Sequence, residues 1–126
     1  MRPLPFRMQG KLHGLVTALV RGDYVGLEQR GQAGLERADG LREGIERYPG
    51  HITMPPPYAF EAIYEWHEIE WDHDNERTRH LAETERTWIL IFTLWYDGEE
   101  SELILEARYH EPFGGEPWIE VEMITS

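Results

Sequence analysis

The stretch from Arg86 to Tyr109 constrains this chain most, because it predicts a β-hairpin. Two runs rich in β-branched and aromatic residues flank Asp97-Gly98, a pair that favours the tight turn between antiparallel strands. In the first run, both alternating faces are apolar, which is typical of a central strand. In the second run, one face is apolar and the other is polar. The stretch therefore predicts the middle of a sheet but no particular chemistry.

The residues before the hairpin predict helices. Apolar side chains recur at helical spacing over about 8–21, which indicates one amphipathic helix. These side chains are Leu12, Leu15, Val16, Leu19 and Val20. Asp23 is expected to cap a short second helix over 24–29, and Asp39 a third helix that ends before Pro49-Gly50.

Four strands are expected after the proline run 55–57, at about 60–71, 86–96, 102–110 and 118–125. Helices followed by a meander predict an α+β fold, with the N-terminal helices packed on one face of a four-stranded antiparallel sheet. At 126 residues the chain is expected to be a single domain, 1–126, with a helical half over about 8–48 and a sheet half over about 59–125.

The charge is divided unevenly along the chain. Residues 1–58 carry eight basic and six acidic side chains, whereas residues 59–126 carry four basic and eighteen acidic ones. A surface of that sign repels phosphate backbones and anionic lipids, so no nucleic-acid or membrane partner is expected. The same field favours a protein with a basic surface as partner, and acidity that serves solubility alone is the alternative.

The compartment is expected to be the cytoplasm. The first residues lack the apolar run of a secretory signal, and no apolar stretch reaches the length of a membrane span. The chain contains no cysteine, so disulfides and thiolate chemistry are excluded.

The second face of the predicted sheet carries apolar side chains that three short helices cannot also cover. This patch consists of Ile89, Ile91, Trp95 and Ile104, with Ile124 as a further candidate. Exposed patches of this kind mark interfaces or ligand platforms. A homodimer that packs sheet against sheet is the favoured explanation, and a heterologous partner or a small-ligand pocket are the alternatives.

Acidic and aromatic residues gather in two segments that are candidates for partner binding. One segment contains Trp66, Glu68, Glu70 and Trp71, and the hairpin turn contains Asp97, Glu99, Glu100 and Glu102. Tryptophans beside carboxylates make strong contact centres, and Trp118 is a further candidate. The competing interpretation is a charged guard at the sheet end and tryptophans that belong to the core.

No motif indicates a catalytic or cofactor site. The cluster of His67, Asp72, His73, Asp74 and His80 has ligand types that suit zinc or manganese, but it lacks a compact metal-binding spacing. Neither a nucleophile elbow nor a phosphate or dinucleotide loop is present. We therefore expect no metal and no cofactor, and an enzyme is the less favoured class.

Three segments carry a resemblance: Leu15 to Tyr24, Met54 to Pro57, and Leu94 to Glu106. With these the chain resembles a bacterial family of small uncharacterised domains, in which a tryptophan-bearing strand, an acidic glycine-containing turn and a further strand follow one another. Here Glu102 stands where those relatives have aspartate. The helix-then-sheet order is also similar to the cystatin-like and nuclear-transport-factor-2-like cone folds, and neither resemblance implies catalytic residues.

Two functions follow as hypotheses. The leading one is a non-catalytic acidic protein-binding module, such as an immunity-type inhibitor of a basic bacterial partner. The alternative is a small-molecule-binding or enzymatic cone fold, with a pocket inside the curved sheet. That pocket would be lined by Tyr24, Phe60, Tyr64, Trp88, Phe92 and Tyr109.

Overall fold

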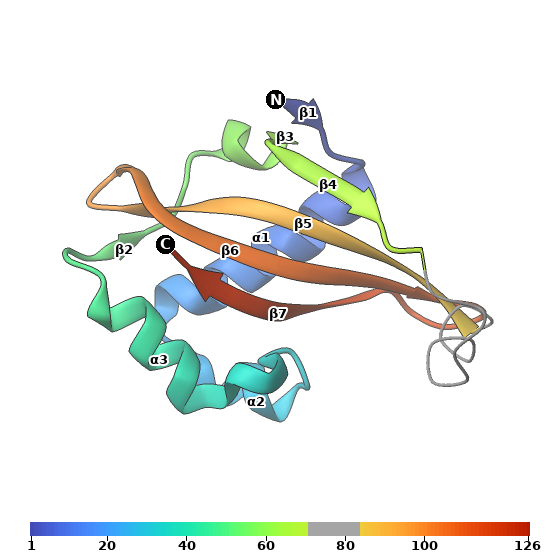
Figure 1. Cartoon of the computed structure of the whole chain (residues 1–126), viewed down its shortest axis with the longest axis horizontal. Coiled ribbons are helices and arrows are strands. Elements are labelled where there is room, and N and C mark those ends of the chain that lie inside the picture. Colours follow the sequence, from blue (N-terminus) through green and yellow to red (C-terminus); the bar gives the residue numbers. More distant parts are fainter. Residues whose placement is uncertain (71–83) are drawn as a thin grey trace.

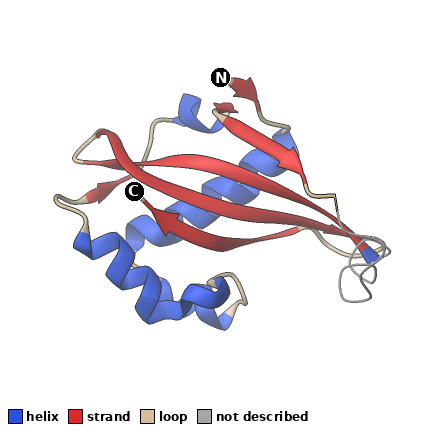
Figure 2. Ribbon diagram, viewed as in Figure 1, coloured by secondary structure: helices blue, strands red, loops and turns tan. Residues whose placement is uncertain are grey.

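The computed structural model describes residues 1–70 and 84–126, and it places a layer of helices behind one face of an antiparallel sheet (Figure 1). The helices are α1 (Phe6–Arg21), α2 (Tyr24–Gln29) and α3 (Arg37–Arg47), with 3₁₀ turns η1 (Gly34–Glu36) and η2 (Pro57–Phe60). The strands are β1 (Arg2–Pro3), β2 (Ile52–Thr53), β3 (Ala62–Ile63), β4 (Glu65–Glu68), β5 (Glu85–Tyr96), β6 (Glu99–Pro112) and β7 (Trp118–Thr125). Figure 2 shows the helices and strands in separate colours.

The main sheet is an antiparallel meander, as predicted, but in the described residues it has five strands instead of four. The order is β2-β5-β6-β7, and β4 pairs with the same edge of β5 as β2 does. The additional strand is β2, which pairs with Trp95 and Tyr96 at the end of β5. Its two residues are too few to produce a periodic pattern in the sequence.

Helix α1 lies across the core-facing side of the sheet and buries one stripe of apolar side chains. The buried residues of this helix are Met8, Leu12, Leu15, Val16, Ala18 and Leu19. The helix begins two residues earlier than predicted, directly after Pro5, and ends at Gly22, which has φ 70°. A positive φ suits glycine because it has no Cβ. None of the described helices is both long and apolar enough to cross a lipid bilayer.

The caps of the two shorter helices differ from each other. The Asp23 side chain accepts a hydrogen bond from the Gly26 N–H at 3.2 Å, so the predicted cap of α2 is confirmed. The predicted Asp39 cap is wrong, because α3 begins at Arg37 and Asp39 lies in its first turn. Glu28 of α2 caps α3 instead, since its Oε1 accepts hydrogen bonds from the Ala38 N–H and the Arg37 Nε. These bonds lower the pKa of Glu28.

The strand predicted over 60–71 is wrong in its first part. Backbone hydrogen bonds at η2 fold the chain into a 3₁₀ turn, which brings Phe60 against Phe92 with stacked rings 5.1 Å apart. The following β3 pairs with the N-terminal β1 rather than with the main sheet. Only β4 joins β5, so tertiary packing overrides the local strand preference here.

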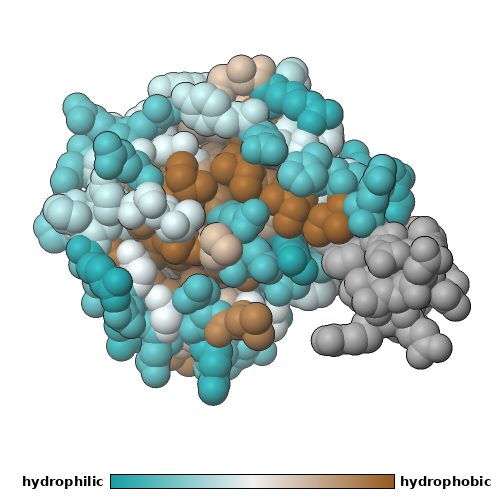
Figure 3. Space-filling view, viewed as in Figure 1, coloured by the Kyte–Doolittle hydropathy of each residue, from teal (hydrophilic) through white to brown (hydrophobic). Residues whose placement is uncertain are grey.

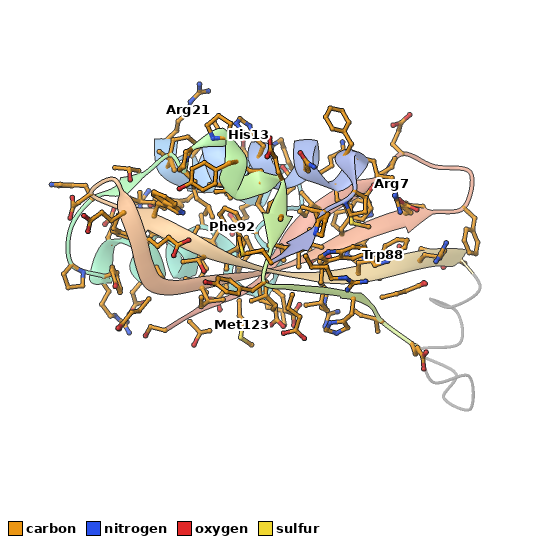
Figure 4. All side chains as sticks on the ribbon, turned by 90° about the horizontal axis from the view of Figure 1, so that it is seen from above. Arg7, His13, Arg21, Trp88, Phe92 and Met123 are labelled. Carbon is orange, nitrogen blue, oxygen red and sulfur yellow. The ribbon has the colours of Figure 1, made fainter. Side chains whose placement is uncertain are left out.

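The core fills the space between the sheet and the helices. In Figure 4 the ring of Phe92 lies in this space, whereas the side chain of Met123 lies on the opposite side of the sheet. The sheet contributes Leu90, Phe92, Leu94, Leu105, Ala107, Tyr109, Ile119 and Val121 to the core, each at most 3 % exposed. The helices therefore cover one face of the sheet, as predicted.

The outer edge of β7 is covered by the loop before α3. The Gln32 carbonyl accepts a hydrogen bond from the Val121 N–H, and the Gln32 side chain donates to the Ile119 carbonyl. Gly34 follows with φ 62°, and a Cβ there would lie 2.1 Å from the Val121 oxygen. Only glycine permits this close approach, which protects the strand edge from other chains.

Candidate functional site

The face of the sheet that points away from the helices, called here the open face, is the candidate site. Its apolar centre spans three strands, because cross-strand registers place the side chains of Ile91, Ile104 and Met123 on this side. Ile91 and Ile104 are half-buried, and Met123 is 42 % exposed. In Figure 3 an apolar band runs across this face between hydrophilic side chains.

The predicted apolar patch lies on the open face. Ile91, Trp95 and Ile104 are half-buried there, and Ile89 is buried. Trp95 lies opposite Glu100 in the hairpin, and Thr93 lies opposite Ile104. The four patch residues therefore share one face as the alternation predicts. The further candidate Ile124 is wrong, because it lies opposite Leu105 and packs against the core, and its neighbour Met123 extends the patch instead.

Carboxylates surround this apolar centre. They are Glu65 on β4, Glu85 on β5, Glu100 and Glu106 on β6, and Glu120 and Glu122 on β7. Arg108 is the one guanidinium that the described strands place among them, and its Nε lies 3.0 Å from Glu122 Oε2. Within the described residues, Glu100 and Glu106 lie without a cationic partner, which leaves the centre of the face negatively charged.

A buried histidine joins three strands at one end of the open face. His110 Nδ1 lies 3.0 Å from Glu85 Oε1, and His110 Nε2 lies 2.7 Å from Glu120 Oε2. The ring stacks on Trp118 with centroids 4.2 Å apart. Both ring nitrogens can donate to these carboxylates together only when the ring carries two protons. Sequence reasoning missed this cluster, because its members come from β5, β6 and β7.

The same cluster contains a hydroxyl, an imidazole and a carboxylate in series. Thr87 Oγ1 lies 3.2 Å from His110 Nδ1, and Glu120 accepts from the other ring nitrogen. A nucleophile must reach its substrate. Thr87 is 0 % exposed, and Glu85 also occupies the Nδ1 side of the ring. The arrangement therefore fits a structural tie better than a catalytic triad.

The predicted acidic turn presents four exposed carboxylates, one of which also has a structural role. Asp97 Oδ1 accepts a hydrogen bond from the His51 N–H at 3.1 Å, so this carboxylate holds β2 against the hairpin. Glu99, Glu100 and Glu102 are exposed. All four predicted acids are therefore at the surface, and Glu100 is the one paired across the hairpin with the patch residue Trp95.

The predicted residues of β4 face the helix side and contact arginines of the same chain. The Arg2 guanidinium lies 3.9 Å from the Trp66 ring centroid, and the Trp66 Nε1–H donates to the Pro3 carbonyl. Arg86 donates hydrogen bonds to both oxygens of Glu68 and lowers the pKa of that carboxyl.

The remaining candidates of this segment lie at its end or beyond the described residues. Glu70 is exposed directly after β4, and Trp71 lies outside the described residues. So do four members of the predicted metal cluster, Asp72, His73, Asp74 and His80. Among the residues that are described, no three histidine or acidic side chains converge as a metal ion would need.

The six residues predicted to line an internal pocket do not converge on one cavity, although Tyr64 and Phe92 both line a small pocket at the surface. Tyr24, Phe60, Trp88, Phe92 and Tyr109 are buried in the core, and burial raises the pKa of Tyr24 and Tyr109. Tyr64 is 66 % exposed, so it lies at the surface instead. In the described part of the chain, these aromatic rings therefore pack as core rather than as the wall of a cone.

A small pocket opens at the border of the open face, beside the hairpin. Tyr58, Tyr64 and Trp95 form its aromatic side, Ile91 and Ile63 add apolar surface, and Glu100 lies at its rim. These aromatic rings come from η2, the residue before β4, and β5. The pocket was not visible in the sequence, because the turn at η2 brings Tyr58 to Trp95 with ring centroids 6.4 Å apart.

Comparison with known proteins assigns the chain to a family. No curated protein and no solved structure matches this chain. One family model matches residues 16–126, from the middle of α1 to the C-terminal residue, and its description is "Domain of unknown function (DUF7668)". The match includes every strand of the main sheet and therefore the whole open face. The chain belongs to the DUF7668 family.

Proposed function

We propose that this protein is a non-catalytic binding module whose open face docks on a protein with a basic surface. The observation that carries the proposal is the combination of an apolar centre at Ile91, Ile104 and Met123 with the carboxylates Glu100 and Glu106 beside it, which have no ion-pair partner among the residues that the structure describes. Protein interfaces have this anatomy, with an apolar core inside a polar rim.

A protein fits this surface better than a small ligand does. The apolar residues lie on three adjacent strands of a sheet, which is a broad surface, whereas small-molecule sites are concave and enclose their ligand. Five of the six rings that would line an internal pocket are packed in the core. A broad surface gains its affinity from a partner of similar extent.

The charge supports a cationic partner rather than a second copy of this chain. Two copies packed sheet against sheet would place an acidic face that carries Glu65, Glu100 and Glu106 against the same acidic face of the other copy. Like charges placed together in an interface cost free energy, and opposite charges accelerate encounter. The net charge of −12 acts in the same direction and disfavours nucleic acid and anionic membranes.

An acidic module of this size would act as an inhibitor if the basic surface that it covers belongs to an active site. This is the immunity-type role, and it is the finer form of the proposal. It accounts for a chain of 126 residues with a filled core, an accessible acidic face and no catalytic arrangement that a substrate can reach in its described residues.

The test is retention of a partner by immobilised chain from a lysate of the source cell. The face variant is Ile104→Lys with Met123→Lys, which removes apolar surface and adds opposing charge. The matched control is Val25→Lys, since Val25 is 52 % exposed on α2 in the helix layer. We expect a basic protein that the wild type and the control retain, that the face variant loses, and whose retention falls as salt increases.

Two results would contradict the proposal. One is a partner that the wild type and the face variant retain equally. The other is a dimer in light scattering that the face variant dissociates, which would make the open face an interface between copies of this chain.

A further inference from the structure

The small pocket beside the hairpin lies at a gap in the edge of the main sheet. β4 pairs with β5 as far as Ile91, and β2 pairs with it from Trp95, so neither strand reaches Thr93. The odd-numbered residues of β5 direct their backbone N–H and carbonyl groups to this edge. The Thr87 carbonyl accepts a hydrogen bond from the Ile69 N–H, and Asp97, the residue after β5, donates its N–H to the His51 carbonyl. The Thr93 N–H and carbonyl therefore face the gap, and Thr93 lines the pocket.

The aromatic wall of the pocket is accessible from solvent. Tyr58 is 62 % exposed, and its ring meets Trp95 edge to face at an interplanar angle of 77°. Tyr64 is exposed and lines the same pocket. Glu100 stands opposite Trp95 across the hairpin and carries no ion pair within the described residues. Aromatic faces, one carboxylate and one backbone carbonyl thus converge on a narrow space.

We propose that this pocket receives the guanidinium group of an arginine side chain. The inference rests on the proposed function and names the contact by which a basic partner would be anchored on the open face. A guanidinium stacks on aromatic rings, donates hydrogen bonds to a carboxylate in a fixed planar geometry, and still has N–H groups for a carbonyl. Tyr58 with Trp95, Glu100 and Thr93 supply these three requirements in turn.

Other groups satisfy fewer of these requirements. An anion would meet the Glu100 carboxylate and the electron-rich ring faces, so it is repelled. An apolar side chain would leave Glu100 and the Thr93 carbonyl without donors in a half-enclosed space, which costs free energy. A lysine ammonium offers charge, but it is more strongly hydrated and lacks the flat shape that suits a narrow pocket.

The probe is a pair of tripeptides, acetyl-Gly-Arg-Gly-amide and acetyl-Gly-citrulline-Gly-amide, titrated into ¹⁵N-labelled protein. Citrulline has nearly the shape of arginine but carries no charge, so it separates charge from size. We expect the arginine peptide to produce saturable shifts of the Trp95 indole N–H and of the Thr93 and Glu100 amides. The citrulline peptide is expected to leave these signals in place at the same concentrations.

Variants make the assignment specific. Glu100→Gln is expected to weaken arginine-peptide binding about two- to fivefold, the range for one partly exposed ion pair. Tyr58→Leu, which keeps an apolar wall, is expected to weaken it by a similar factor. Glu106→Gln is the matched control, because Glu106 lies on the same face but does not line the pocket. Tyr58 and Glu100 are exposed, so neither substitution threatens the fold.

Three results would contradict arginine binding in this pocket. They are equal shifts with both peptides, shifts centred on Glu106 and Met123, or an equal loss of peptide affinity in Glu100→Gln and Glu106→Gln. The failure of this pocket proposal can be separated from that of the proposed function. A protein partner that requires Ile104 and Met123, but tolerates Tyr58→Leu and Glu100→Gln, overturns the pocket and leaves the function. If the arginine peptide saturates the pocket but the chain retains no protein partner, the pocket stands and the proposed function fails.

Discussion

The carboxylate of Asp97 occupies the place where a side chain on Gly50 would have to be. A Cβ on Gly50 would lie 2.3 Å from Asp97 Oδ2, and Gly50 has φ 99°, which only glycine adopts without strain. Asp97 in turn accepts a hydrogen bond from the His51 N–H and donates its own N–H to the His51 carbonyl. The end of the hairpin and the segment after α3 are thereby fitted to each other.

Gly50→Ala is expected to lower the free energy of unfolding by about 2–3 kcal/mol, because it combines backbone strain with displacement of the Asp97 carboxylate. Gly31→Ala is the control, since Gly31 has φ 73° but no atom near its Cβ position, and it is expected to cost about 1 kcal/mol. Urea unfolding measures both. Equal losses of unfolding free energy in the two variants would show that the contact with the Asp97 carboxylate adds nothing to the cost of Gly50→Ala.

The hairpin could be predicted because its determinants are local. Alternating apolar residues and the Asp97-Gly98 turn lie within one stretch of sequence, and the turn has the two positive φ values, 52° and 79°, that this pair favours. Alternation also places Ile91 and Ile104 on the face away from the core. The uncovered face was therefore predictable, and the binding of a partner there remains a prediction.

Features that depend on long-range register could not be predicted. The His110 cluster requires Glu85, His110 and Glu120 to align across three strands, past the irregularity between Glu106 and Ala107. The turn at η2, which brings Tyr58 to Trp95, depends on the packing of Phe60 in the core. Neither relationship leaves a periodic signal in the sequence.

His110→Phe is expected to lower the free energy of unfolding by about 2–3 kcal/mol. Phenylalanine keeps the stacking on Trp118 but removes the ring donor from the Glu120 carboxylate and leaves Glu85 with the Thr87 hydroxyl as donor, in a largely buried space. The cost should shrink by at least about 1 kcal/mol in a chain that already carries Glu85→Gln and Glu120→Gln. Urea unfolding of the four chains measures this coupling, and full additivity would contradict the proposed tie between strands.

Tyr96→Phe is expected to change how stability depends on alkaline pH. The Tyr96 hydroxyl donates to the Ile45 carbonyl at 2.6 Å, and burial raises the pKa of Tyr96 from 10 to about 12. Because the folded pKa exceeds the unfolded one, the contribution of Tyr96 is complete below about pH 10 and is lost as the pH rises toward 12.

Below pH 10 the Tyr96→Phe chain should therefore be less stable than the wild type by about 1 kcal/mol, the typical net value of one hydrogen bond. Between pH 10 and 12 the wild type should lose stability faster, so the two curves converge. Burial also raises the pKa values of Tyr24 and Tyr109, so the stability of both chains is expected to fall by a similar amount over this pH range. Parallel curves over this range would contradict the role given to Tyr96.

Adjacent residues of β6 provide the final test, because Ile104 and Leu105 point to opposite faces. Leu105 is fully buried under the helices, so Leu105→Ala is expected to cost about 2–5 kcal/mol. Ile104 is half-buried on the open face, and Ile104→Ala is expected to cost about 1 kcal/mol or less.

If the open face binds a partner, the order of the two variants reverses for binding. Ile104→Ala weakens the complex directly, whereas Leu105→Ala acts only through loss of folded protein. Urea unfolding and partner titration of the same two chains measure both orders, and a larger unfolding cost for Ile104→Ala would mean that this face is not open.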